Sequence, residues 1–204
     1  MNTFSRVAMV MMAMAGGVAA QPKPEAKPGD AKIAPKMADA KAADKPAGMP
    51  DMKPPPELAE MAKSAVGTWR CKGQGMDHTM KLVEMTGTMK VALGLDNWWL
   101  HSSFESIMGK EPFRFESFTS FDGGTKKWKR VMVESGGGWS AGESAGLKAG
   151  KVDWELAMHT MMGDAMFRDH EDVSDPKAGV KMSGEFSMDH GKTWTKVYEM
   201  VCKK

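Results

Sequence analysis

From Trp99 onward, several segments carry arginine, histidine or tyrosine at the same every-second positions as tryptophan or methionine. In a β-strand every second side chain points to the same face, so this spacing divides each segment into an inner and an outer set. If the tryptophan-bearing positions face inward, Arg130, Arg168 and Tyr198 lie inside together. Arginine and tyrosine donate strong hydrogen bonds to carboxylates, so this parity predicts a site for a fatty-acid-like or other small amphipathic molecule.

The predicted inward positions fall in four segments. They are Trp99, His101, Ser103 and Glu105; Trp128, Arg130, Met132 and Glu134; Met166, Arg168, His170 and Asp172; and Trp194, Lys196, Tyr198 and Met200. The predicted ligand-binding residues among them are Trp99, His101, Trp128, Arg130, Arg168, His170 and Tyr198. A register shift of one residue would exchange the two faces, leaving the charged residues in solvent and the tryptophans as a packed core.

Methionine is unusually frequent, with 22 in 204 residues, and two segments combine it with histidine. Thioether and imidazole groups suit Cu(I), so these segments predict an alternative metal site. Its candidate ligands are His78, Met80, His159, Met161 and Met162. The same enrichment extends to Met37, Met49 and Met52, where no site is expected, so methionine as an adaptable core residue is the favoured interpretation.

Catalytic patterns are weak. His170 and Asp172 would share one strand face, whereas Asp169 and Glu171 would share the other, and charged residues of this kind are mostly exposed. Ser140 lies among glycines but not in the strand-turn-helix context of a nucleophile elbow. We therefore assign no catalytic residue and no cofactor, and an enzyme with a site at a barrel mouth stays an alternative based on fold analogy alone.

The elements that must position these residues are short strands after one short helix. Pro at the first turn, early acids and apolar residues on one side predict a helix over residues 56–65. Period-two segments separated by turn signals then predict an all-β fold. The predicted strands are 67–76, 80–91, 97–107, 112–122, 127–135, 138–144, 152–159, 165–173, 180–189 and 193–202. Because every connection is short, we expect an up-and-down antiparallel β-barrel of about ten strands.

The N-terminal quarter predicts export. Residues 1–20 carry Arg6, an apolar run and a small-residue cleavage pattern, which indicate a signal peptide and a mature chain that begins at Gln21. Residues 21–56 consist largely of Ala, Pro, Lys and Asp without aromatic residues, which predicts a disordered tether before the domain at 57–204. The apolar run is too short to span a bilayer, so we expect a periplasmic or extracellular protein with no membrane span after cleavage.

The chain has two cysteines, Cys71 and Cys202. An even count in an exported protein indicates a disulfide, with free thiols as the alternative. Cys71 falls in the first predicted strand and Cys202 in the last, and barrel closure places those strands side by side. We therefore predict a bond across the seam of the barrel.

Four aromatic motifs carry a family resemblance. They are Val66-Gly67-Thr68-Trp69, Asn97-Trp98-Trp99-Leu100, the stretch 120–128, and Asp189-His190-Gly191-Lys192-Thr193-Trp194 before Tyr198. In this order they resemble the bacterial domain of unknown function family 1579 over roughly residues 57–203. The resemblance implies a calycin-like barrel, similar to lipocalins and fatty-acid-binding proteins, with Trp69 packed across its closed end. It implies no established activity.

The haem-binding barrel nitrobindin shares the Gly-Thr-Trp opening and holds its haem through a late histidine. The late histidine here, His190, falls in a predicted turn, which argues against haem ligation.

The sequence thus favours an exported, non-enzymatic barrel that binds a small hydrophobic or amphipathic molecule in its lumen. A formal net charge of +2 with no concentrated basic face argues against nucleic acid as a partner. Cu(I) binding, an enzyme at the barrel mouth, and a packed barrel with a surface interaction role are the alternatives. The sequence does not specify the oligomeric state.

Overall fold

The computed structural model describes residues 52–161, 163–175 and 177–204. The predicted signal peptide and residues 21–51 of the predicted tether lie outside these described residues. The helix α1 spans Pro56–Ala65, as predicted. Among the described residues, no helix is both long and apolar enough to cross a membrane.

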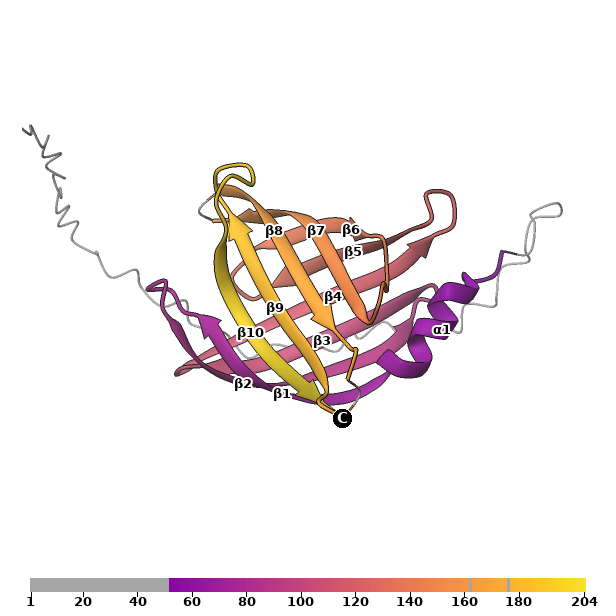
Figure 1. Ribbon diagram of the computed structural model, residues 1–204, viewed down its shortest axis with the longest axis horizontal. Helices are drawn as coiled ribbons and strands as arrows, with labels where there is room; N and C mark the ends of the chain where they lie inside the picture. The colour runs from indigo at the N-terminus through magenta and orange to yellow at the C-terminus, as the bar shows by residue number, and fades with distance from the viewer. Residues whose placement is uncertain (1–51, 162, 176) are drawn as a thin grey trace, which may run out of the picture. The chain divides into compact units, whose positions relative to one another are not determined.

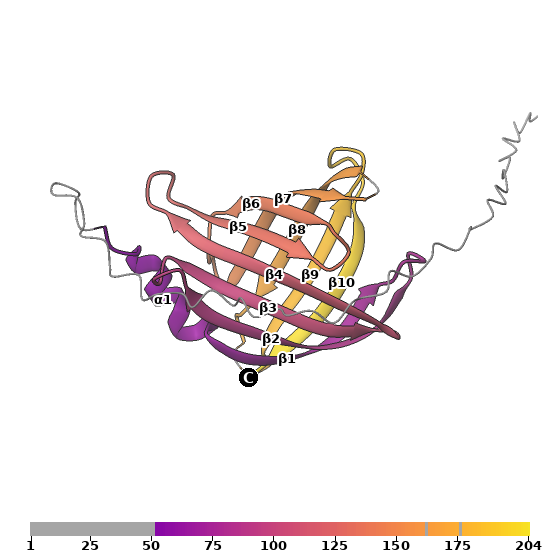
Figure 2. The same cartoon turned by 180° about the vertical axis from the view of Figure 1, so that it is seen from behind.

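Ten antiparallel strands follow α1 and close into one barrel. Their bounds are β1 Gly67–Met76, β2 Leu82–Gly94, β3 Trp99–Met108, β4 Glu111–Asp122, β5 Lys127–Glu134, β6 Trp139–Ser144, β7 Lys151–Thr160, β8 Gly163–Asp172, β9 Val180–Ser187 and β10 Thr195–Lys203. Each strand pairs with its neighbours in sequence, and β1 pairs with β10 to close the sheet (Figures 1 and 2). The predicted fold class is confirmed.

Aspartates set two of the turns. Asp122 accepts hydrogen bonds from the backbone of Gly124 and Thr125 and from the Thr125 hydroxyl. Asp189 accepts hydrogen bonds from backbone N–H groups and hydroxyls in the turn between β9 and β10, which hold the pKa of its carboxyl at about 2. Such side-chain bonds compete with the hydrogen bonds between strands. β9 therefore ends at Ser187 and β10 begins at Thr195, so both strands stop two residues short of their predicted ends at this turn.

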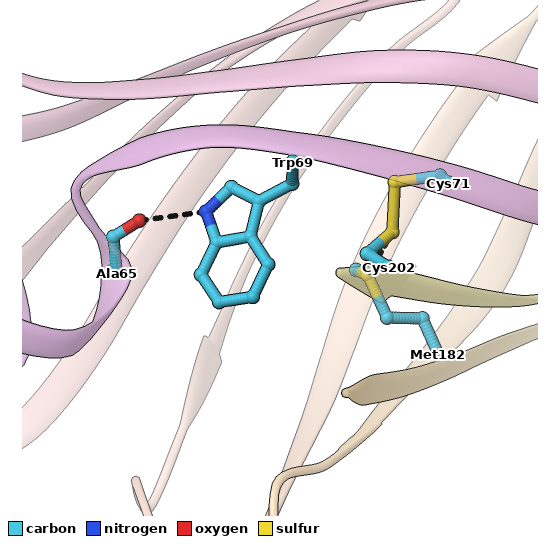
Figure 3. Close-up of a disulfide and its surroundings, with 5 residues drawn as sticks. All are labelled: Ala65, Trp69, Cys71, Met182 and Cys202. Carbon is cyan, nitrogen blue, oxygen red and sulfur yellow. Dashed lines mark hydrogen bonds between the residues drawn. A yellow bond between two sulfur atoms is a disulfide. The ribbon is translucent and has the colours of Figure 1, made fainter. Parts of the chain in front are cut away.

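The seam between β1 and β10 carries the predicted disulfide, which is confirmed. Cys71 lies directly opposite Cys202 in the register, and the two residues are joined by a bond between their sulfur atoms. Both are 2% exposed and belong to an inward-facing cluster, with the Met182 sulfur 4.0 Å from Cys202 Sγ (Figure 3). A disulfide of this kind fits an oxidising, exported environment.

The helix packs against one end of the barrel. Leu58 and Ala62 are buried and join the core formed by the barrel strands. The Trp69 indole donates a hydrogen bond of 2.9 Å to the Ala65 carbonyl (Figure 3). The Lys204 ammonium donates to the Ser64 carbonyl at 2.7 Å and lies over the Trp69 ring. These contacts tie α1, the start of β1 and the C-terminus together.

Removing the disulfide should destabilise the barrel without changing its fold. The bond joins residues 131 positions apart, so its loss frees a long loop in the unfolded chain and should lower the free energy of unfolding by about 2–5 kcal/mol. Urea denaturation of the Cys71→Ser/Cys202→Ser double variant, compared with the disulfide-bonded protein, measures this change. An unchanged unfolding midpoint would show that closure of the sheet does not depend on the bond.

Candidate ligand-binding lumen

The two ends of the lumen are filled differently. A core that includes two residues of α1 comprises the buried side chains Leu58, Ala62, Val91, Leu100, Trp128, Val152, Trp154, Leu156 and Phe167. Toward the opposite end, Met85 and Ser140 are buried, but several other inward side chains are only partly buried; these are Met108, Phe113, Phe115, Met132, Met158, Phe186 and Val197. We call this second region the open half of the lumen.

A buried charge network lies inside the barrel. The Arg130 guanidinium on β5 donates to Asp169 Oδ2 at 2.7 Å and to Glu171 Oε1 at 2.6 Å, both on β8. It also lies 3.8 Å from the centre of the Trp154 ring, and the Trp154 indole donates to Glu171 at 3.0 Å. The Tyr198 hydroxyl donates to the other oxygen of Asp169. Every strongly polar group in the network therefore has a partner.

Glycines make room for these long contacts. Asp169, Gly184 and Tyr198 lie in one row across β8, β9 and β10. A Cβ at Gly184 would lie 2.3 Å from the Tyr198 ring, so only glycine lets that ring cross β9 to reach Asp169. Gly142 similarly leaves the position opposite Arg130 on β6 without a side chain.

Burial shapes the charges of the network. Burial raises the pKa of Asp169 to about 6, although Arg130 opposes the change. Burial also acts to lower the pKa of Arg130, but Glu171 and Asp169 outweigh it and raise that pKa. The pKa of Tyr198 is raised well above its usual value, first by burial and then by Asp169, so the phenol keeps its proton and acts as a donor. When both acids are ionised, the network carries one excess negative charge.

The predicted inward parity is correct for β5 and wrong for β3 and β8. On β5, Trp128 is buried and Arg130 is 16% exposed. On β3 the buried positions are Leu100, Phe104 and Ser106, and on β8 they are Phe167 and Asp169. On β10, Tyr198 and Met200 face inward as predicted, whereas Lys196 is exposed and pairs with Glu199 after a bulge.

The reason is that aromatic residues occur on both faces of this barrel. Trp99, His101, Arg168 and His170 therefore lie on the outer face. The His101 ring stacks on Phe118 and bonds to Glu116 at 2.5 Å. The Arg168 guanidinium lies 3.9 Å from the centre of the Trp194 ring, and His170 bonds to Asp153 at 2.6 Å. Of the predicted ligand-binding set, the structure brings together Arg130 and Tyr198 inside, through Asp169, with Trp128 in the core near α1.

The described residues of the predicted copper site lie apart, His78 and Met80 in the turn after β1, and His159 and Met161 at the end of β7 and in the turn after it. His78 bonds to Glu111 at 3.2 Å, between the turn after β1 and the start of β4. His159 bonds to Asp164 at 2.7 Å and stacks on Trp139. Met80 is exposed with φ 63°, Met161 is 91% exposed, and Met162 lies outside the described residues. Within the described ranges, no group of three or more His, Cys, Asp or Glu residues could hold a metal ion. His190, with φ 59°, lies in the turn before β10.

Sequence reasoning missed the acids that face inward. Asp169 and Glu171 were assigned to a solvated face because charged residues are rarely buried without a partner. The partner is Arg130, three strands away in the barrel and 39 residues away in sequence. One signal was available in the sequence, the alternation of apolar Val152, Trp154 and Leu156 on β7. The register between β7 and β8 pairs Trp154 with Asp169, which places Asp169 on the same inward face.

The outer surface offers two other kinds of site. One groove of about 590 Å³ crosses β1 to β4 among Arg70, Lys72, Glu105 and Arg114, and one of about 580 Å³ crosses β7 to β10 among lysines and acids. Separately, an apolar row crosses β4 to β8 on the outer face and comprises Phe118, Val131, Ala141, Ala157 and Met166. Contiguous apolar surface is frequent at interaction sites, so this row bears on the alternative of a surface interaction role.

The comparisons with known proteins extend only to the fold. No protein-family model matches the chain, so the resemblance to family 1579 is not confirmed, and no curated protein matches it. Among solved structures, Rv2717c from M. tuberculosis is similar with a TM-score of 0.54 and 12% identity, covering 74% of this chain and 99% of that one. This likeness and the closed sheet fit a calycin-like barrel.

The raised pKa of Asp169 predicts a pH dependence of stability. Because the folded state holds this proton more tightly than the unfolded chain, the stabilisation it gives is complete below pH 3.8 and is lost as the pH rises through about 6. The free energy of unfolding of the wild type, relative to Asp169→Asn, should therefore decrease between pH 4 and pH 7. Urea denaturation at both pH values measures the difference.

Asp172→Asn is the matched control on the same strand. Hydrogen bonds from Ser174 lower the pKa of Asp172, so its contribution should change with pH in the opposite direction. If the free energy of unfolding of the wild type relative to Asp169→Asn increased with pH instead, the raised pKa of Asp169 would be contradicted.

Proposed function

We propose that this barrel binds a small amphipathic molecule in the open half of its lumen. The observation that supports this most directly is that inward apolar side chains in this half, among them Met132, Met158 and Phe115, stay partly exposed. Apolar side chains that face inward yet keep contact with solvent can gain from covering by a ligand.

Methionine suits this role. Its unbranched side chain and polarizable sulfur adapt to ligands of different shape, and it is common at surfaces that accept several partners. Met108, Met132 and Met158 line the open half from β3, β5 and β7. A bound apolar chain would displace water from these side chains and from Phe113 and Phe115.

The outer grooves are a weaker basis for specific binding. Their walls include Lys, Arg, Asp and Glu side chains, some of which pair with one another, as Lys196 does with Glu199. Exposed pairs contribute little and their side chains must be ordered when a ligand binds. Inward side chains on a closed sheet are already held in place by their strands.

Filling the open half should abolish binding of a neutral amphiphile. We expect 1-decanol to bind the disulfide-bonded protein and Met132→Trp to weaken that binding about tenfold or more, because the indole occupies the space that the chain would take. Isothermal titration calorimetry measures the affinity, and near-ultraviolet circular dichroism checks that the variant is folded.

Val133→Trp is the matched control, because Val133 lies next to Met132 on the outer face and is 48% exposed. Its affinity for 1-decanol should equal that of the wild type. Ala165→Trp, inward on β8, gives a second lumen variant should Met132→Trp not fold. Absence of 1-decanol binding to the wild type, or equal affinity in the wild type and the folded lumen variants, would rule the proposal out.

A further inference from the structure

The charges inside the lumen do not suit a carboxylate ligand. The inward faces of β5 and β8 carry Arg130, Glu134, Asp169 and Glu171, which is one guanidinium against three carboxylates. Arg130 is already bonded to two of them. An incoming carboxylate would have to displace Asp169 or Glu171 and leave it buried without its cation, which is strongly unfavourable. The arginine that the sequence offered to an acidic ligand is therefore occupied.

Glu134 is the inward acid that has no cation. It ends β5 on the same face as Met132 and lies opposite Phe115 of β4. Among the described residues it takes part in no recorded ion pair, and burial alone raises the pKa of its carboxyl. A half-buried carboxylate without a partner is a group that a cationic ligand can satisfy.

Ser140 supplies a second, independent observation. Its side chain is fully buried on the inward face of β6, and its Oγ finds no hydrogen-bond partner among the described residues. The register places Ser140 between Met132 of β5 and Met158 of β7. A buried hydroxyl without a partner is uncommon in native structures and indicates a place where a polar group of a ligand can bind.

Glu134 and Ser140 lie diagonally across β5 and β6, and the Glu134 carboxylate lies over Gly138, two residues before Ser140. Met132 lies directly opposite Ser140, so Glu134, two residues further along β5, is its diagonal neighbour on the same face. Such diagonal positions are about 7–8 Å apart, a distance that the long glutamate side chain can reduce. A group with several donors can therefore contact the carboxylate and the hydroxyl at the same time.

We infer that the ligand of the open half is an amphipathic primary amine, whose ammonium group lies between Glu134 and Ser140 and whose apolar chain packs among Met132, Met158 and Phe115. This inference rests on the proposed function and specifies its ligand class. A primary ammonium has three donors, enough for Glu134 and for the Ser140 oxygen. Its positive charge also offsets the excess negative charge that Glu134 and the Arg130 network place in the lumen.

Three ligands with the same ten-carbon chain separate the two claims. Decylamine, 1-decanol and decanoate are titrated into the disulfide-bonded protein at pH 8, below their aggregation concentrations. We expect decylamine to bind tighter than decanoate by about tenfold or more. The ammonium group can form an ionic hydrogen bond with Glu134, whereas the carboxylate of decanoate is repelled by it. Binding of 1-decanol should lie between the two.

Variants then locate the ammonium group. Glu134→Gln should weaken decylamine binding about tenfold and 1-decanol binding much less, and near-ultraviolet circular dichroism checks that the variant is folded. Ser140→Ala should weaken decylamine binding less, since a neutral hydrogen bond is lost. Glu105→Gln, an exposed residue of the outer groove across β1 to β4, is the matched control and should bind decylamine as the wild type does.

The outcomes distinguish the inference from the proposed function. If 1-decanol binds but decanoate binds as tightly as decylamine, or Glu134→Gln leaves decylamine affinity unchanged, the amine assignment is wrong and the lumen site stands. If Glu105→Gln rather than Glu134→Gln weakens decylamine binding, the amine binds the outer groove and the assignment is also wrong. If none of the three ligands binds, both claims fail.

Discussion

The neutralisation of Arg130 by Asp169 and Glu171 is the interaction on which the interior of this barrel depends. A guanidinium inside a barrel must be paired. The free energy needed to bury an isolated charge is larger than the stabilisation that the surrounding strands provide. The pairing connects β5 to β8 across the lumen, and Tyr198 and Trp154 extend it to β10 and β7. Four strands are therefore positioned by one polar cluster as well as by the backbone ladder.

This cluster also determines how the lumen can be used. On its α1 side, Trp128 and Val152 belong to the same buried core as Leu58 of the helix. On its other side the sheet is lined by methionines and phenylalanines that are incompletely buried. The disulfide between Cys71 and Cys202 holds the seam of the sheet at its α1 end, next to the pair Arg70 and Lys203.

The fold could be predicted from local features, whereas the site required contacts that no local feature reveals. Asp122 and Asp189 with their glycines mark turns through side-chain bonds within a few residues, and the period-two pattern between turns defines strands. Cys71 and Cys202 could be paired because the topology itself brings the first and last strands together.

The direction of individual side chains was harder to predict. Trp128 lies on the inner face of β5, but Trp99 lies on the outer face of β3. That outer face also carries the aromatic contact between His101 and Phe118. Arg130 and Tyr198 were correctly placed inside, but the partners that they contact there were not predicted. Their acceptors are Asp169 and Glu171 of the protein itself, which no periodicity could separate from an ordinary solvated edge.

The most direct test of the lumen site is a nuclear magnetic resonance titration with methionine methyl groups labelled with carbon-13. The methionines report on both faces, since Met108, Met132 and Met158 line the open half whereas Met161 and Met166 are exposed. Addition of 1-decanol should shift the methyl resonances of the first three in a saturable way and leave the last two unchanged. Shifts confined to Met161 and Met166, or absent throughout, would contradict the account of a ligand bound inside the barrel.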